Sequence, residues 1–117
     1  MKIVTYRDLD SKNELLPVLD NAFGWPFNPR TYEKIVKIDP RLRNSAVGFC
    51  ASENERVVGF VGVMDLTTRT LNKKVEHAGG IYGVATLPSH VRRRISTALM
   101  NSAHEHFKDK GYRFSFL

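Results

Sequence analysis

Residues 75–117 decide the fold and read VEHAGGIYGVATLPSHVRRRISTALMNSAHEHFKDKGYRFSFL. The segment 75–86 is rich in apolar and small residues and predicts a strand, and residues 112–117 predict another. Between them, apolar residues recur at every fourth position of a helix expected over 93–110: Ile95, Leu99, Ala103 and Phe107. A strand, a helical crossover and a second strand form a βαβ unit, so we expect two parallel neighbours with a right-handed connection.

The chain before residue 75 predicts five further elements. They are a strand over 2–7, a helix over 11–24, a helix that begins at Asn28 and ends before Pro40, and strands over 46–52 and 56–67. Ser11 and Glu14 fit a capping box, and Pro17 is expected to kink the first helix or delay its start. Gly59 and Gly62 predict that a backbone or a ligand approaches the third strand closely. The order is β-α-α-β-β-β-α-β, an α/β (α+β) fold with a mixed sheet.

Length and composition favour a single domain over residues 1–117. The chain has 42% hydrophobic and 26% charged residues, which argues against collagen-like, disordered and coiled-coil classes. No apolar stretch approaches the roughly 20 residues of a membrane span, and the first residues lack the apolar core of a signal peptide. We therefore expect a cytoplasmic protein without a membrane partner. Cys50, the single cysteine, is expected to be a buried, inert thiol.

The charge balance is basic, because 18 Lys and Arg against 12 Asp and Glu give a net charge of +6. This excess favours an anionic partner such as nucleic acid, a phosphorylated cofactor or an acidic surface. The one run of three like charges, at 92–94, falls at the expected start of the last helix. Free N–H groups and a partial positive charge at a helix N-terminus would hold an anion together with the guanidinium groups. The residues therefore predict an anion site over 92–97.

The stretch 79–100 also resembles a known family. Its sequence of strand, proline, basic turn and apolar helix is similar to the acetyl-CoA motif of the GNAT N-acetyltransferases. Residues 83–88, GVATLP, resemble the Eis-like branch of that family, and residues 57–60, VVGF, resemble the strand before the motif. The resemblance covers nearly the whole chain and implies a GNAT-like sheet.

The family has two more strands after the one expected at 112–117. The resemblance therefore implies an N-terminal fragment of a longer protein, or a sheet completed by another chain, with a fold complete at 117 residues as the less expected alternative. An apolar edge strand is prone to pair with a second copy, so a homo-oligomer formed through this edge is the corresponding expectation.

The phosphate loop departs from the family's pattern of Gln or Arg, two residues, Gly, one residue, and Gly or Ala. Val91 stands at the Gln or Arg position, Arg94 at the first Gly, and Ser96 at the last position. Glycine there lets a pyrophosphate approach the backbone, whereas Arg94 adds a Cβ and a long side chain. Either the guanidinium of Arg94 turns aside and pairs with phosphate, or CoA binding is weakened.

The resemblance implies an acetyl-CoA-dependent N-acetyltransferase in which a primary amine attacks the thioester directly. The acceptor would be an amine of a small molecule or a peptide. The pantetheine arm would pair with the backbone of Val84, Ala85 and Thr86. The pyrophosphate would bind at the start of the last helix, where the candidate residues are Val91, Arg92, Arg93, Arg94, Ile95, Ser96 and Thr97.

Two residues of the strand at 75–86 are candidates for catalysis. Alternation places five residues on one face of that strand: Glu76, Ala78, Gly80, Tyr82 and Val84. Glu76 is the expected proton acceptor, directly or through water, and Tyr82 the expected substrate contact. The structural alternatives are a surface charge for Glu76 and a half-buried strand aromatic for Tyr82.

Two other functions stay open. The altered phosphate loop would suit a non-catalytic CoA- or acyl-CoA-binding domain. The net charge would suit a nucleic-acid-binding module, but the sequence has no aromatic-rich basic platform and no helix-turn-helix pattern, so nucleic acid is not the expected partner. His104 and His106 lie two positions apart on a helix and point away from each other, so no metal is expected.

Overall fold

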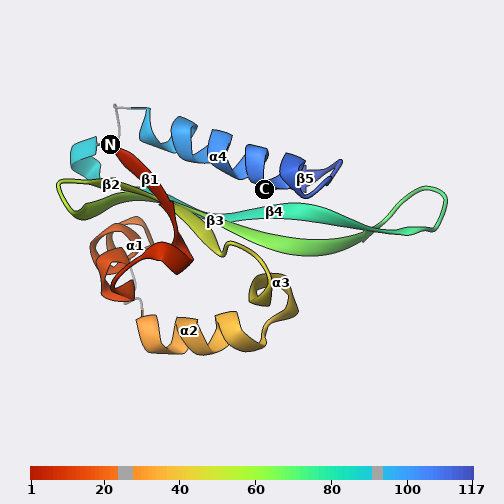
Figure 1. Cartoon of the computed structure of the whole chain (residues 1–117), viewed down its shortest axis with the longest axis horizontal. Coiled ribbons are helices and arrows are strands. Elements are labelled where there is room, and N and C mark those ends of the chain that lie inside the picture. Colours follow the sequence, from red (N-terminus) through yellow and green to blue (C-terminus); the bar gives the residue numbers. More distant parts are fainter. Residues whose placement is uncertain (24–27, 91–93) are drawn as a thin grey trace.

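The computed structural model describes residues 1–23, 28–90 and 94–117, and a five-stranded sheet lies between two helical layers (Figure 1). In spatial order the strands are β1 (Lys2–Thr5), β2 (Gly48–Glu53), β3 (Arg56–Arg69), β4 (Val75–Thr86) and β5 (Ser115–Phe116). One face carries α1 (Leu16–Phe23), α2 (Pro29–Ile38) and α3 (Pro40–Arg43), and the other carries α4 (Ile95–Asp109) (Figure 1). No helix within the described ranges is long and apolar enough to cross a membrane.

The predicted order of strands and the mixed sheet are confirmed. Strands β1 to β4 pair in antiparallel fashion, whereas β4 and β5 are parallel neighbours connected through α4. The last strand is shorter than the predicted 112–117, because the chain first turns back onto the end of α4. The Tyr112 N–H donates to the Phe107 carbonyl at 3.0 Å, and the Tyr112 hydroxyl donates to Asp65 at 2.9 Å.

Prolines set the starts of α1 and α3. The predicted capping box at Ser11 and Glu14 forms, but a 3-10 turn over Lys12–Leu15 precedes α1. Pro17 lies in the first turn of α1, where no intrahelical N–H bond is lost, so it delays the helix and does not kink it. The sequence analysis missed α3, which begins at Pro40 directly after α2 ends. A proline that ends one helix here also occupies the favoured first position of the next.

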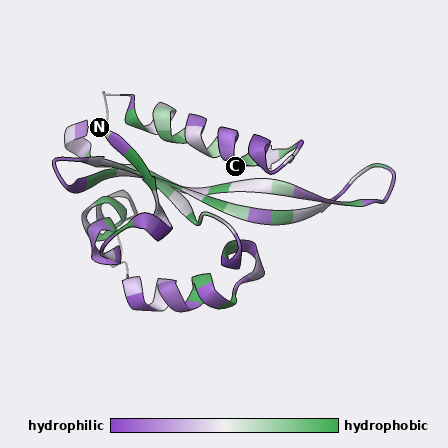
Figure 2. Cartoon of the chain, in the orientation of Figure 1, coloured by the Kyte–Doolittle hydropathy of each residue, from purple (hydrophilic) through white to green (hydrophobic). Residues whose placement is uncertain are grey.

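Glycines of the sheet make room for α4 and for a large side chain of the neighbouring strand. A Cβ on Gly79 would lie 2.5 Å from the Phe107 ring of α4, and one on Gly62 would lie 2.5 Å from the Tyr82 ring. The close approach predicted at the glycines of β3 therefore comes from the protein's own side chains. Hydrophobic residues follow the central strands, while α2 and α4 present mainly hydrophilic ones (Figure 2).

Strand β4 contains a β-bulge that the alternation argument did not foresee. Tyr82 pairs with Gly62, but the next partners are Ala85 and Phe60, so β4 holds one extra residue at this point. Gly83 has a φ of 59°, a conformation that favours glycine. The prediction that Val84 shares the face of Tyr82 is therefore wrong, because the extra residue shifts the alternation.

Two polar or reactive groups lie in the interior: the Cys50 thiol within the sheet, and the Nε2 atom of half-buried His106 on α4. Cys50 is fully buried, as predicted, and burial raises the pKa of its thiol to about 12. His106 packs against Phe49 with ring centroids 5.6 Å apart, and its Nε2 is buried without a hydrogen-bond partner among the described residues. Burial, followed by the charge of Lys110, lowers the pKa of His106 below its ordinary value.

The His106 environment predicts a loss of stability in acid. Below the unfolded-state pKa of about 6.5, the unfolded chain binds a proton at His106 that the folded chain resists, so stability falls as pH falls. His106→Leu should therefore show a shallower decline in unfolding free energy between pH 7.5 and 5.5, measured by urea denaturation. The same substitution at exposed His104 controls for losing a histidine from α4. An identical decline in wild type and His106→Leu would contradict this account.

Candidate functional site

The outer edge of β4 is open over half of its length. Strand β5 pairs with β4 at Gly79 and Gly80, and among the described residues no strand continues this pairing from Ile81 to Thr86. An edge with unpaired N–H and C=O groups can bind an extended ligand as a further strand. This stretch contains the bulge at Gly83 and the three residues predicted to pair with pantetheine. Of these, Val84 is exposed, Thr86 is half-buried and Ala85 is buried.

The N-terminus of α4 offers backbone donors. Arg94 is its N-cap, and the first bond back to this residue runs from the Ala98 N–H to the Arg94 carbonyl at 3.1 Å. The N–H groups of residues 95–97 precede that bond and have no acceptor within the helix. They coincide with the positive end of the helix dipole, which favours an anion. Val91, Arg92 and Arg93 lie outside the described residues.

Arg94 has a backbone conformation that is unusual for a residue other than glycine. Its φ is 57° and its ψ is 27°, in the left-handed region where glycine is favoured. This position aligns with the first glycine of the motif that residues 79–100 resemble. The Arg94 side chain makes no capping hydrogen bond and is exposed. The departure noted in the sequence therefore lies at a site where the backbone itself favours glycine.

The open strand edge and the start of α4 are adjacent in space. Ile95 is buried against β3, where a Cβ on Gly59 would lie 2.8 Å from Ile95 Cγ2. Gly59 is the register partner of Thr86, the last residue of β4. The helix start therefore lies over the end of the open edge. Ile95 can offer only its backbone to a ligand, whereas Ser96 is half-buried and Thr97 is exposed.

Tyr82 anchors α2 to the opposite face of the sheet. Its hydroxyl donates to the Val47 carbonyl at 2.9 Å and is hydrogen-bonded to the Tyr32 hydroxyl of α2. Because the Tyr82 hydrogen is used by Val47, Tyr32 is the donor to Tyr82. Burial is the largest of the effects that raise the pKa of Tyr82 far above its ordinary value, and burial raises that of Tyr32 to about 12. Both hydroxyls stay protonated at neutral pH.

Val47, whose carbonyl is the acceptor of this network, has a strained backbone conformation. It is fully buried with a φ of 66°, which is rare for a β-branched residue. Its N–H donates to Ser45 Oγ at 2.9 Å, and its carbonyl also accepts the Val63 N–H at 3.0 Å. Tyr32 was not among the candidate site residues of the sequence analysis, and no sequence signal marks Val47 as a hydrogen-bond acceptor.

Glu76 lies apart from Tyr82. The two are six residues apart on β4, which corresponds to about 20 Å along a strand. The Glu76 carboxylate accepts two bonds from Arg113, at 2.6 and 2.9 Å, and this pairing lowers its pKa. The structure therefore does not bring the two candidate catalytic residues together, because a shared strand face does not imply proximity.

Comparison with known proteins places this arrangement in context. The sequence profile of the acetyltransferase (GNAT) domain matches residues 6–117, whereas no curated protein matches the chain. A GNAT family acetyltransferase of Staphylococcus aureus superposes with a TM-score of 0.74 and 17% identity, covering 100% of this chain and 86% of that one. An aminoglycoside antibiotic 6'-N-acetyltransferase of Acinetobacter haemolyticus superposes with a TM-score of 0.72 and 16% identity, covering 99% and 77%. The NatB acetyltransferase complex bound to CoA and MES superposes with a TM-score of 0.59 and 20% identity, covering 87% of this chain and 61% of that one.

The left-handed conformation predicts that Arg94→Gly stabilises the fold. A non-glycine residue in this region costs about 1 kcal/mol, and glycine relieves that cost. The unfolding free energy from urea denaturation should rise by about 1 kcal/mol, less the entropy that glycine adds to the unfolded chain. Arg94→Ala is the matched control, because alanine keeps the Cβ and should bring no gain. Equal stabilities of the two variants would contradict the assigned conformation.

The Tyr82 network predicts coupled losses of stability. Tyr82→Phe leaves the Tyr32 hydroxyl without its acceptor, and each single Phe variant should cost about 1–3 kcal/mol. Tyr32→Phe and Tyr82→Phe should combine to less than the sum of their separate costs, since both remove the same bond. Tyr112→Phe, which removes a hydroxyl on the other side of the sheet, should add fully to Tyr82→Phe. Additive costs for Tyr32 and Tyr82 would show that the bond does not contribute.

Proposed function

Because the chain belongs to the GNAT acetyltransferase family, we propose that it transfers an acetyl group from acetyl-CoA to a primary amine. The observation that carries this proposal is the open edge of β4 directly beside the N-terminus of α4. One element offers unpaired backbone groups for an extended amide-containing arm, and the other offers N–H donors for phosphate. The wording of residues 83–88 makes the Eis-like branch the proposed position within the family.

Each part of acetyl-CoA has a counterpart in the proposed site. The backbone of Val84, Ala85 and Thr86 would pair with the amides of the pantetheine arm. The N–H groups of residues 95–97 would hold the pyrophosphate, and the guanidinium groups of residues 92–94 would balance its charge. Arginines at a helix N-terminus are electrostatically unfavourable on their own. A bound phosphate would reverse this, because it attracts both the guanidinium groups and the positive end of the helix dipole.

The proposed reaction is a direct transfer. The nitrogen of the free amine attacks the thioester carbon, the new C–N bond forms, and the C–S bond breaks with CoA leaving as thiolate. The amine proton passes to solvent, and the thiolate takes up a proton. A backbone N–H of the open edge polarises the thioester carbonyl, a contribution of about 3 kcal/mol when such a donor is well aligned. Tyr82 acts as a positioning residue and does not supply a proton, because its hydroxyl hydrogen is donated to the Val47 carbonyl.

A non-catalytic CoA-binding domain is the second candidate. The observation that favours it is Arg94, which places a side chain where the family's loop has glycine. The two candidates differ in turnover: an enzyme releases CoA thiol from acetyl-CoA only when an amine is present. A binding domain holds acetyl-CoA with similar affinity and releases no thiol with any amine.

Removing the two arginines next to Arg94 tests the anion site. Arg92→Ala combined with Arg93→Ala should weaken acetyl-CoA binding about tenfold or more in titration calorimetry, because charge-assisted bonds to phosphate are lost. Lys34→Ala combined with Lys37→Ala removes the same charge from exposed positions of α2 and should leave the affinity unchanged. Equal weakening by both pairs would mean that only net charge matters. Unchanged affinity in the arginine variant would remove the anion site from the proposal.

A further inference from the structure

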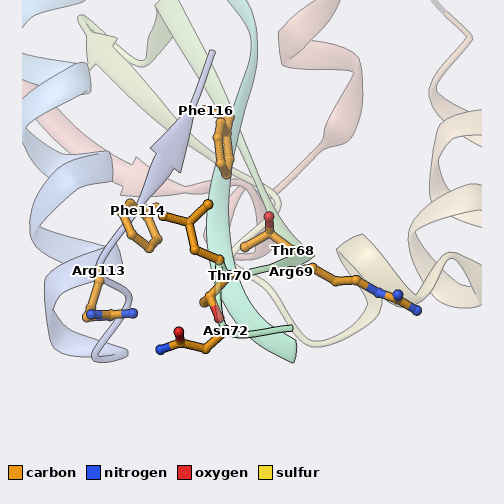
Figure 3. A pocket seen from close by; sticks show the side chains of 8 residues that line it. Thr68, Arg69, Thr70, Asn72, Arg113, Phe114 and Phe116 are labelled. Atoms are coloured by element: carbon orange, nitrogen blue, oxygen red, sulfur yellow. The ribbon is translucent and has the colours of Figure 1, made fainter. Parts of the chain in front are cut away.

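A groove lies at the hairpin end of β4, away from the candidate site at Thr86, and Figure 3 shows the side chains that line it. It has a volume of about 530 Å³ and is formed by the C-terminal segment and the β3–β4 hairpin. Its uncharged lining residues are Phe114, Phe116, Leu71, Thr68, Thr70 and Asn72. We call it the hairpin groove.

The hairpin groove begins where the open edge of β4 begins. Phe116 is the register partner of Gly80, the last residue of β4 that pairs with β5. Thr68, farther out, is the partner of Glu76. The groove therefore runs from the junction at Gly80 toward the hairpin, while the open edge runs from the same junction toward α4.

The reactive end of a bound acetyl-CoA falls at this junction. If the pyrophosphate lies at residues 95–97, its pantetheine arm starts beside Thr86 and extends along the open edge. Five residue steps separate Thr86 from Ile81, which is about 17 Å of strand. The thioester would thus reach the region of Ile81, next to Phe116 and the mouth of the hairpin groove.

The lining of the hairpin groove favours an apolar ligand. The Phe114 and Phe116 side chains are 46% and 49% exposed, so both rings offer apolar area to a ligand. In Figure 3 both rings come from the C-terminal segment, and Thr68, Thr70 and Asn72 bring polar groups from the strands and turn of the hairpin. Half-exposed rings with a few hydroxyl and amide groups are typical of sites for small organic molecules.

The charges around the hairpin groove disfavour a polycation. Among the described residues that line it, the charged ones are Arg69 and Arg113, and no carboxylate is present. Glu76, the nearby carboxylate, is already paired with Arg113 through two bonds. A polyamine or an aminoglycoside would bring several positive charges to a wall without a free negative partner.

We propose that the hairpin groove binds the acceptor, and that the acceptor is a primary amine on an aromatic or aliphatic body without a second positive charge. This inference rests on the proposed acetyl transfer for the position of the thioester, and on the groove itself for the class of amine. The amine nitrogen reaches the thioester at the junction, and the apolar body lies against Phe116 and Phe114.

Equilibrium binding of three amines tests this inference. The probes are 2-phenylethylamine, spermidine and kanamycin, each titrated into the wild-type chain with and without saturating CoA and followed by ligand-observed NMR. We expect 2-phenylethylamine to bind about tenfold or more tightly than spermidine and kanamycin. Tighter binding of either polycation, or no binding of 2-phenylethylamine in both conditions, would overturn the proposal.

Variants separate the groove from the rest of the surface. Phe116→Ser should weaken 2-phenylethylamine binding about tenfold, and Phe116→Leu should restore part of it, because leucine keeps apolar area. Ile38→Ser removes an exposed apolar side chain from α2 and is the control that should change nothing. Unchanged binding in Phe116→Ser would overturn the assignment of the groove. If the wild-type chain binds 2-phenylethylamine but does not bind acetyl-CoA, the proposed acetyl transfer is refuted and the assignment of the groove is not.

Discussion

The close packing of α4 on the sheet at Gly59 and Gly79 is the contact on which the candidate site depends. Ile95 occupies the space above Gly59, and Phe107 occupies the space above Gly79, so both ends of the helix are held against the strands. A Cβ at either glycine would come within 3 Å of these side chains and push the helix away. This packing holds the helix N-terminus over Thr86 and thereby places phosphate-binding donors beside the open edge of β4.

The opposite face of the sheet is fixed by a different interaction. The strained carbonyl of Val47 accepts the Tyr82 hydroxyl, and Tyr82 accepts the hydroxyl of Tyr32, so one buried network joins α2, β4 and the start of β2. A conformation that costs free energy persists here because three hydrogen bonds fix the backbone of Val47. The bulge at Gly83 directly follows Tyr82, so the network also fixes the strand at the point where its edge is open.

The sequence predicted what depends on local periodicity, but not what depends on packing. The apolar residues at every fourth position of α4, together with the order strand, helix, strand, were enough to predict the parallel pairing of β4 and β5. The bulge at Gly83 could not be read from alternation, since a single extra residue leaves no local pattern. The shared face of Glu76 and Tyr82 was inferred correctly, yet six residues of strand separate them, and the Glu76 carboxylate is paired with Arg113, a partner distant in sequence. Arg94 was recognised as a departure from a family pattern, and only the fold showed that its backbone is left-handed.

Backbone amide shifts on titration of the ¹⁵N-labelled chain with acetyl-CoA test the central claim most directly. The account predicts that the largest changes fall on residues 81–86 and 94–97, because these N–H groups would form new bonds to the pantetheine amides and the pyrophosphate. The N–H groups of α2 should shift less, since they would form no bond to acetyl-CoA and α2 contacts this strand only through side chains such as Tyr32 against Tyr82. Binding with the largest changes elsewhere, or no binding of acetyl-CoA, would contradict the account.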